Sequence, residues 1–186
     1  MNYRTKIKID GKEVETLKDI LPEQPGLDIL FIAKTPALKS VEAGHYFQGT
    51  QGTMFWNRLR EYGILENVST FEDEGLLGQN YGITDIVKVP RNYGNEPSNQ
   101  EYQDGLRRIL DLIQKHSPRV IVFVYKKVLD QILKNGFNVR SKSQYGFNHE
   151  FAKMFGSEVF VFPMSGTPCT REQAQISMDE LVAFMD

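Results

Sequence analysis

Two polar segments that could bind an anionic ligand each follow a strongly apolar run. LDILFIA ends at KTPA (34–37), and VFVF ends at PMSGTPCTRE (163–172). The second segment could present the backbone N–H groups of Ser165, Gly166 and Thr167 to a phosphate, although the same residue types suit any tight turn. Open α/β sheets bind ligands at the carboxyl ends of their strands, so the two segments are predicted to face each other across one site.

Basic side chains gather after the predicted strands. Lys126 and Lys127 follow the run RVIVFVY at a helix N-terminus, where backbone amides and the helix dipole favour a phosphate. Lys34 and Arg171 also fall at or after strand ends, and for each of these residues the alternative is ordinary solvated surface charge. The net charge of −2 argues weakly against an extended nucleic-acid footprint.

Strand and helix patterns alternate through the body of the chain. This order predicts an α/β fold, a three-layer α/β/α sandwich with a mainly parallel central sheet of about four strands. Residues 4–15 alternate around Asp10-Gly11, which predicts a hairpin, with a short helix near 15–21. We therefore expect an N-terminal appendage over residues 1–26 and one domain over 27–186. The predicted strands of the domain are 27–33, 81–90, 119–125 and 157–162, and its helices begin near Thr53, Ser98, Lys126 and Thr170.

The composition narrows the class of protein. With 186 residues, of which 40% are hydrophobic and 25% charged, the chain is expected to form one globular unit. Neither a signal-peptide core nor an apolar stretch of about 20 residues is present, so a cytoplasmic location is expected. The single cysteine, Cys169, excludes an internal disulfide framework, and with three histidines it argues against a structural zinc site. No metal or cofactor is predicted.

Five segments, taken in order, resemble the uracil-DNA glycosylase superfamily, and most of all its mismatch-specific uracil/thymine-DNA glycosylases. They are FIAKTPALKS, GHYFQGTQGTMFWNRL, YGITDIVKVP, RVIVFVYKKVLDQIL and FVFPMSGTPCTRE. That family has G-I-N-P-G after its first strand, an aromatic-rich loop leading into a phenylalanine-tryptophan helix, a T-D-V-V-K second strand and a final P-N-P-S-G-L loop. The resemblance covers residues 27–186.

The resemblance implies an enzyme that hydrolyses the N-glycosidic bond of uracil, or of a mismatched or damaged pyrimidine, in DNA during base excision repair. The base must leave the duplex stack and enter a pocket. Thr35 matches the family asparagine that positions the attacking water, and Phe47, beside Tyr46, matches the aromatic residue under the base. His45 could protonate or hydrogen-bond the base. Alternatively, Phe47 only packs under its loop and His45 is an exposed histidine without a role.

Several positions depart from the family pattern. A threonine hydroxyl is shorter than a carboxamide and presents one oxygen in place of an O/N pair. Met164 stands where a polar group is expected, and Tyr125 replaces a glycine. Asp85 is expected to be a structural carboxylate at a strand end. The full set of candidates is Thr35 and Ser165 for catalysis, Ala33, Lys34, His45, Tyr46 and Phe47 for the base, and Lys126, Lys127, Gly166, Thr167, Pro168 and Arg171 for DNA.

Three hypotheses follow from these motifs. The first is a DNA glycosylase that needs no metal. The second is a superfamily member that binds nucleic acid or a nucleobase without turnover, because Thr35 and Met164 stand in place of asparagines. The third is an unrelated doubly wound protein for a small molecule, since fold does not fix function.

Overall fold

The computed structural model describes residues 1–68 and 70–186. Its strands are β1 (Arg4–Ile9), β2 (Lys12–Leu17), β3 (Ile29–Ala33), β4 (Tyr81–Asp85), β5 (Val120–Phe123), β6 (Gly146–Phe147) and β7 (Glu158–Val161). Its α-helices are α1 (Leu38–Ala43), α2 (Thr50–Glu61), α3 (Asn99–His116), α4 (Lys126–Asn135), α5 (Ala152–Phe155) and α6 (Arg171–Met185). Short 3-10 helices cover Glu72–Gly75, Leu77–Gln79 and His149–Phe151.

The central sheet has the strand order β4-β3-β5-β7-β6. The pairs β3–β4, β3–β5 and β5–β7 are parallel, and only the β6–β7 pair is antiparallel. Every residue of β3, β4 and β5 is buried, which explains why β3 and β5 appear in the sequence as continuous apolar runs. The α/β prediction is confirmed. The sheet has five strands instead of about four, because the two residues of β6 are too short a strand to leave a periodic signal.

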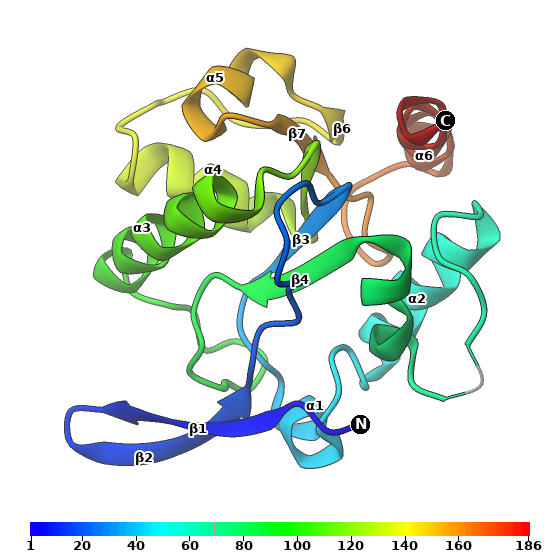
Figure 1. The fold of residues 1–186 in the computed structure, drawn as a ribbon. Helices are drawn as coiled ribbons and strands as arrows, with labels where there is room; N and C mark the ends of the chain where they lie inside the picture. The colour runs from blue at the N-terminus through cyan, green and yellow to red at the C-terminus, as the bar shows by residue number, and fades with distance from the viewer. Residues whose placement is uncertain (69) are drawn as a thin grey trace.

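Helices cover both faces of the sheet (Figure 1). One apolar cluster packs α2 and α6 against one face, and a second packs α3, α4 and α5 against the other. The predicted capping boxes at Ser98–Glu101 and Thr170–Gln173 are both formed, and they begin α3 and α6. Helix α2 begins at Thr50, after Gly49, and not at Thr53 as expected. The hydroxyl of Thr53 instead donates to the carbonyl of Gly49 within the first turn.

The N-terminal hairpin is formed as predicted, with β1 and β2 joined through Asp10 and Gly11, both at positive φ. The helix expected near 15–21 is wrong. Strand β2 continues to Leu17, and Ile20 pairs with Ile83 of β4, so this segment is extended. Packing explains the difference, since Leu17 and Ile20 are buried against the domain.

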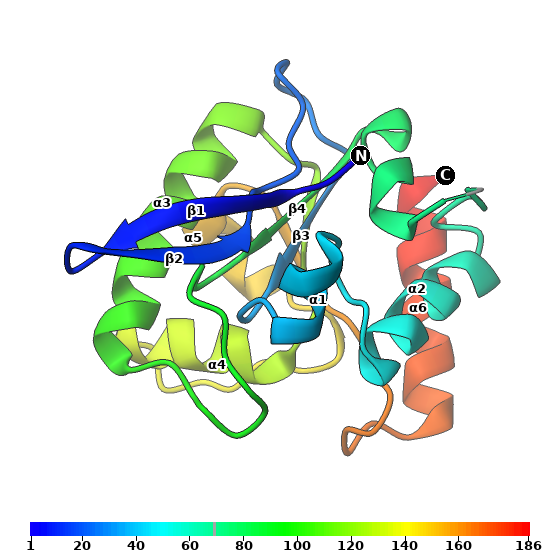
Figure 2. The same cartoon turned by 90° about the horizontal axis from the view of Figure 1, so that it is seen from below.

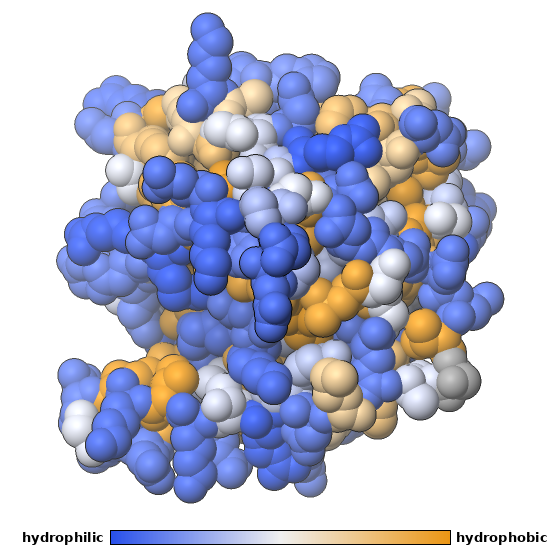
Figure 3. All heavy atoms as spheres, viewed as in Figure 1, coloured by the Kyte–Doolittle hydropathy of each residue, from blue (hydrophilic) through white to orange (hydrophobic). Residues whose placement is uncertain are grey.

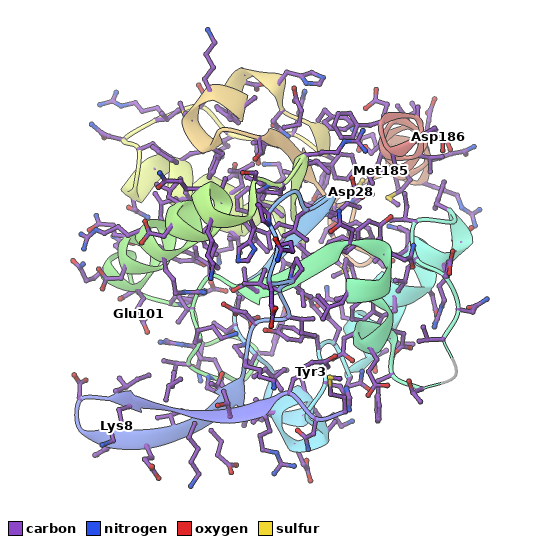
Figure 4. All side chains as sticks on the ribbon, viewed as in Figure 1. Tyr3, Lys8, Asp28, Glu101, Met185 and Asp186 are labelled. Carbon is purple, nitrogen blue, oxygen red and sulfur yellow. The ribbon has the colours of Figure 1, made fainter. Side chains whose placement is uncertain are left out.

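The hairpin lies across the end of the sheet to which the strands β3 and β4 run, beside α1 (Figure 2). Tyr3 anchors it: its backbone N–H donates to Gly44 O at 2.9 Å, and its ring meets His45 edge-on at 5.7 Å. In Figure 4 Tyr3 lies where the hairpin meets α1, whereas Lys8 projects from the far part of the hairpin. On the face of the molecule that Figure 3 shows, which is the view of Figure 1, polar side chains cover most of the surface. Apolar side chains form separate patches there, one of them on the hairpin. None of the helices in the described part of the chain has the length and apolar character that crossing a membrane requires.

Candidate functional site

A pocket of about 220 Å³ opens at the carboxyl ends of β3 and β4. The two strands are in register with Ala33 opposite Asp85, so the residues that follow Ala33 and the carboxylate of Asp85 reach the same place. The pocket is lined by residues from the ends of β2 and β4, the segments after β3 and β5, α1, the loop before α2 and the first turn of α2. They are Leu17, Thr35, Pro36, Ala37, Ser40, Tyr46, Phe47, Gly49, Thr50, Gln51, Gly52, Asp85 and Tyr125.

Two of the predicted base-binding residues, Tyr46 and Phe47, line this pocket together with Thr35. Thr35 is half-buried and lies two residues after the end of β3. Tyr46 is 2% exposed, and its hydroxyl donates to Lys18 O at 3.1 Å. The aromatic ring of Phe47 is half-buried, so one part of it packs on the core while another part faces the pocket. These three residues give the pocket a hydroxyl group and two aromatic side chains.

The loop that carries Phe47 is held in an uncommon backbone conformation. Phe47 has a φ of 55°, in the left-handed region that bulky residues rarely adopt. Its surroundings fix it. Trp56 Nε1 donates to Tyr46 O at 3.2 Å, and the backbone N–H of Gln48 donates to Ser40 Oγ at 3.1 Å. Strain of this kind persists where neighbouring contacts over-determine it, and it is common at ligand sites.

Gly52 lies directly against the backbone of Phe47. A Cβ atom at Gly52 would lie 2.5 Å from the carbonyl oxygen of Phe47 and 2.6 Å from its Cα. Glycine is therefore the residue that lets α2 and the loop approach so closely.

His45 does not line the pocket. It is 3% exposed, its Nδ1 lies 2.9 Å from Asp73 Oδ1, and its ring stacks on Phe71 with centroids 3.6 Å apart. Asp73 also accepts the backbone N–H of Tyr46 at 2.8 Å. Burial raises the pKa of Asp73, against the opposing effect of these two hydrogen bonds. The expectation of an exposed histidine was wrong, because its aromatic neighbours enclose the ring. His45 and Asp73 together anchor the base of the pocket loop.

The deep end of the pocket is a network of charged groups around Asp85. This residue is 1% exposed, and Lys88 Nζ lies 3.2 Å from its Oδ2. Lys88 also binds Asp19 Oδ1 at 3.0 Å and Tyr46 OH at 3.0 Å, while Arg108 binds Asp19 Oδ2 at 2.9 Å. Each buried charge thus has a partner of opposite sign, as low-dielectric surroundings require.

Protonation in this network is governed by burial. Burial raises the pKa of Asp85, whereas Lys88 lowers it. Burial also raises the pKa of Tyr46 well above its ordinary value, and Asp85 and Asp19 add to that effect. At Tyr125 burial raises the pKa to about 12, with a contribution from Asp85. Both phenols are therefore neutral around pH 7. The hydroxyl of Tyr46 already donates to Lys18 O, so Tyr125 is the phenol that can donate a hydrogen bond in the pocket.

The second polar segment lies beside the pocket and does not line it. Ser165, Gly166 and Arg171 border a separate depression with Arg58, Met164 and Cys169. Gln51 links the two places, because its side-chain amide donates to Ser165 O at 3.4 Å while Gln51 itself lines the pocket. Thr167 bonds Met164 O at 2.6 Å within its own turn, and Pro168 is exposed. The predicted grouping of Thr35 with Ser165 in one cavity is wrong, since Met164 is buried and turns the segment toward the apolar core.

The lysines near the pocket are already paired with carboxylates. Lys34 and Lys127 lie 2.9 and 3.3 Å from Glu96 Oε1, and Lys126 lies 2.8 Å from Asp130 Oδ2. Burial alone would raise the pKa of Glu96, but hydrogen bonds from the two lysines bring it below its ordinary value. Ala33, the remaining candidate, is buried at the end of β3 and is not among the lining residues. Over residues 1–68 and 70–186, no three His, Cys, Asp or Glu side chains gather as a metal site.

Among the pocket residues that sequence reasoning missed are Asp85, Tyr125 and Gln51. Asp85 was expected to be only structural, although its place at the end of a strand adjacent to β3 pointed to the same sheet edge. Tyr125 lies two residues after β5, the other neighbour of β3, and caps α4. The parallel topology therefore points to both residues, whereas no sequence pattern points to Gln51.

Aromatic side chains and converging polar groups at the carboxyl edge of a mainly parallel sheet are typical of ligand sites in open α/β proteins. A family model described as the Uracil DNA glycosylase superfamily matches residues 23–168. The chain belongs to this superfamily.

Proposed function

We propose that this protein is a DNA glycosylase that hydrolyses the N-glycosidic bond of a pyrimidine in DNA, such as uracil or a mismatched or damaged base. The observation that carries the proposal is that Thr35 and Phe47 line one pocket in a chain of this superfamily. A pyrimidine turned out of the duplex would stack against Phe47, with its sugar at the mouth.

The reaction needs little more than a placed water and a site that tolerates charge. As the bond between C1′ and the base nitrogen breaks, positive charge develops on the sugar, and the base leaves with the electron pair. The water oxygen then bonds to C1′ and gives up a proton, which neutralises the departed base anion. The hydroxyl of Thr35 would hold this water, and the neutral phenol of Tyr125 would offer a hydrogen bond toward the base.

Incubation with defined duplexes tests this proposal. The panel contains G:U, G:T and G:C pairs, 5-substituted cytosines and single-stranded uracil, and alkaline cleavage reveals abasic sites. We expect strand breaks from at least one substrate, and far fewer from Thr35→Ala. If no substrate gives breaks above those of Thr35→Ala, the chain is not a glycosylase of these bases.

The side chain at position 35 should set the rate. Loss of one well-placed polar group typically costs about 100-fold in turnover, so Thr35→Ala should slow excision by that order. Thr35→Asn should speed it, because a carboxamide reaches further and offers both a donor and an acceptor. Single-turnover rates on the best substrate provide the measurement. An unchanged or lower rate for Thr35→Asn would mean that the water is held by another group.

A second candidate function is binding of nucleic acid or a nucleobase without turnover. It is favoured by the pairing of Lys34, Lys126 and Lys127 with carboxylates and by the position of Ser165 outside the pocket. This function predicts DNA affinity that falls as salt rises, with no abasic product.

Glu96 should restrain DNA binding under either function. Glu96→Gln frees the ammonium groups of Lys34 and Lys127 for phosphates, so affinity for a duplex oligonucleotide should rise at low salt. The slope of log affinity against log salt should steepen by up to about two, one unit for each phosphate gained. Glu23→Gln makes the same charge change in an exposed residue before the amino end of β3 and should alter neither quantity. Equal behaviour of the two variants would show that these lysines do not meet DNA.

A further inference from the structure

The pocket has an exposed mouth and a buried deep end. This difference determines which edge of a bound base contacts which side chain. Gln51, Thr50 and Ala37 are exposed at the mouth. Asp85 and Tyr46 are 1% and 2% exposed and form the deep end. A pyrimidine that enters from a nucleic-acid strand keeps N1, the atom bonded to the sugar, at the mouth. The ring position opposite N1 is C4, so the substituent on C4 is the part of the base that reaches Asp85.

The chemistry at C4 separates the pyrimidines into two classes. Uracil and thymine carry a carbonyl oxygen there, which only accepts hydrogen bonds. Cytosine and its 5-substituted forms carry an amino group, which only donates. An ionised carboxylate only accepts, so it pairs with the amino group and repels the carbonyl.

Asp85 is held so that it can act as this acceptor. Burial raises the pKa of Asp85, and Lys88, whose Nζ lies 3.2 Å from Oδ2, opposes this effect and orients the carboxylate. The charged and titratable groups that face this pair are Asp19 after β2, Arg108 on α3, Tyr46 in the pocket loop and Tyr125 after β5. Asp19 lies between Lys88 and Arg108 and balances their charge, so Lys88 remains fixed beside Asp85.

We propose that Asp85 makes the pocket selective for a pyrimidine with an amino group at C4, cytosine or a 5-substituted cytosine, over its 4-oxo counterpart. The proposal rests on the proposed function for the presence of a base in this pocket, but it does not require that the base be excised. Rejection of uracil follows from the same geometry, because its O4 would meet the carboxylate without a hydrogen between them.

Binding of free bases tests the selectivity without any need for catalysis. The probes are 1-methylcytosine and 1-methyluracil, whose methyl group occupies the place of the sugar, titrated into the full chain at pH 7.5 and followed by NMR. We expect 1-methylcytosine to bind about tenfold or more tightly than 1-methyluracil. Equal binding, tighter binding of 1-methyluracil, or no binding of either probe would overturn the proposal.

The isosteric variant Asp85→Asn assigns the effect to this residue. Its carboxamide can donate to O4, so the preference for 1-methylcytosine should disappear or reverse. Asp28→Asn is the matched control, because Asp28 precedes β3 at the other end of the strand, as Figure 4 shows. It should keep the wild-type ratio. A wild-type ratio in Asp85→Asn would contradict the assignment, and if this variant does not fold, the wild-type ratio alone decides.

The excision panel separates this inference from the proposed function. Release of uracil in preference to cytosine and its derivatives would refute the selectivity and leave the glycosylase intact. A tenfold preference for 1-methylcytosine over 1-methyluracil, with no abasic product from any duplex, would support the selectivity and refute the glycosylase function.

Discussion

Replacing Gly52 with alanine is expected to reduce base excision by about 100-fold, the loss that a misplacement of roughly 1 Å produces at a reacting centre. The new methyl group would lie 2.5 Å from the carbonyl oxygen of Phe47, so the pocket loop must move. Alanine is the better helix former by about 1 kcal/mol, so the loss cannot come from helix propensity. Besides the rate, the fluorescence of Trp56 reports the movement, because it is the only tryptophan and donates to Tyr46 O.

Gly78→Ala is the matched control for this change. A Cβ atom at Gly78 meets no atom within 4 Å, and the residue does not have a positive φ. Its rate and fluorescence should equal those of the wild type. If Gly52→Ala behaved like Gly78→Ala in both measurements, the close approach of α2 to the pocket loop would not be needed for activity.

Replacing Trp56 with alanine is expected to lower the free energy of unfolding by about 3–5 kcal/mol. The indole is fully buried, touches Phe47 and Phe55, and bonds Tyr46 O. Its removal creates a cavity and leaves a buried carbonyl without its donor, which adds to the cost. Urea denaturation followed by circular dichroism measures the change.

Met54→Ala provides the comparison for Trp56→Ala. Met54 is on the same helix but 44% exposed, so its substitution should change the free energy of unfolding by no more than about 0.5 kcal/mol. Similar losses in the two variants would mean that the interior under the pocket loop is less tightly packed than the structure shows.

Local patterns were sufficient to predict much of the fold. Buried parallel strands produce apolar runs, and capping boxes at Ser98 and Thr170 mark helix starts through hydrogen bonds within a few residues. The errors came from long-range packing. The segment after β2 was expected to be helical, yet it is extended because Ile20 pairs with Ile83, 63 positions along the chain.

Only part of the candidate site was predicted, because the position of some of its residues also depends on long-range packing. Thr35, Tyr46 and Phe47 could be placed at the pocket because they follow β3 directly or lie in the long loop after it. The position of His45 depended on Asp73 and Phe71, which lie more than 25 residues away and have no local pattern linking them to it. The alternation of strands and helices predicts only that the carboxyl ends of β3 and β4 share one edge of the sheet. The position of Asp85 beside the pocket depends in addition on the direct pairing of β3 with β4.

The hairpin at the start of the chain makes the pocket of this protein different from one built on the shared superfamily region alone. That region begins at residue 23, yet Leu17 lines the cavity, Lys18 O accepts the Tyr46 hydroxyl, and Asp19 joins Lys88 to Arg108. Removal of residues 1–22 would take away one negative charge between two cations at the deep end of the pocket. Residues outside the region matched by the family model therefore help to build this pocket and to set the charge around it.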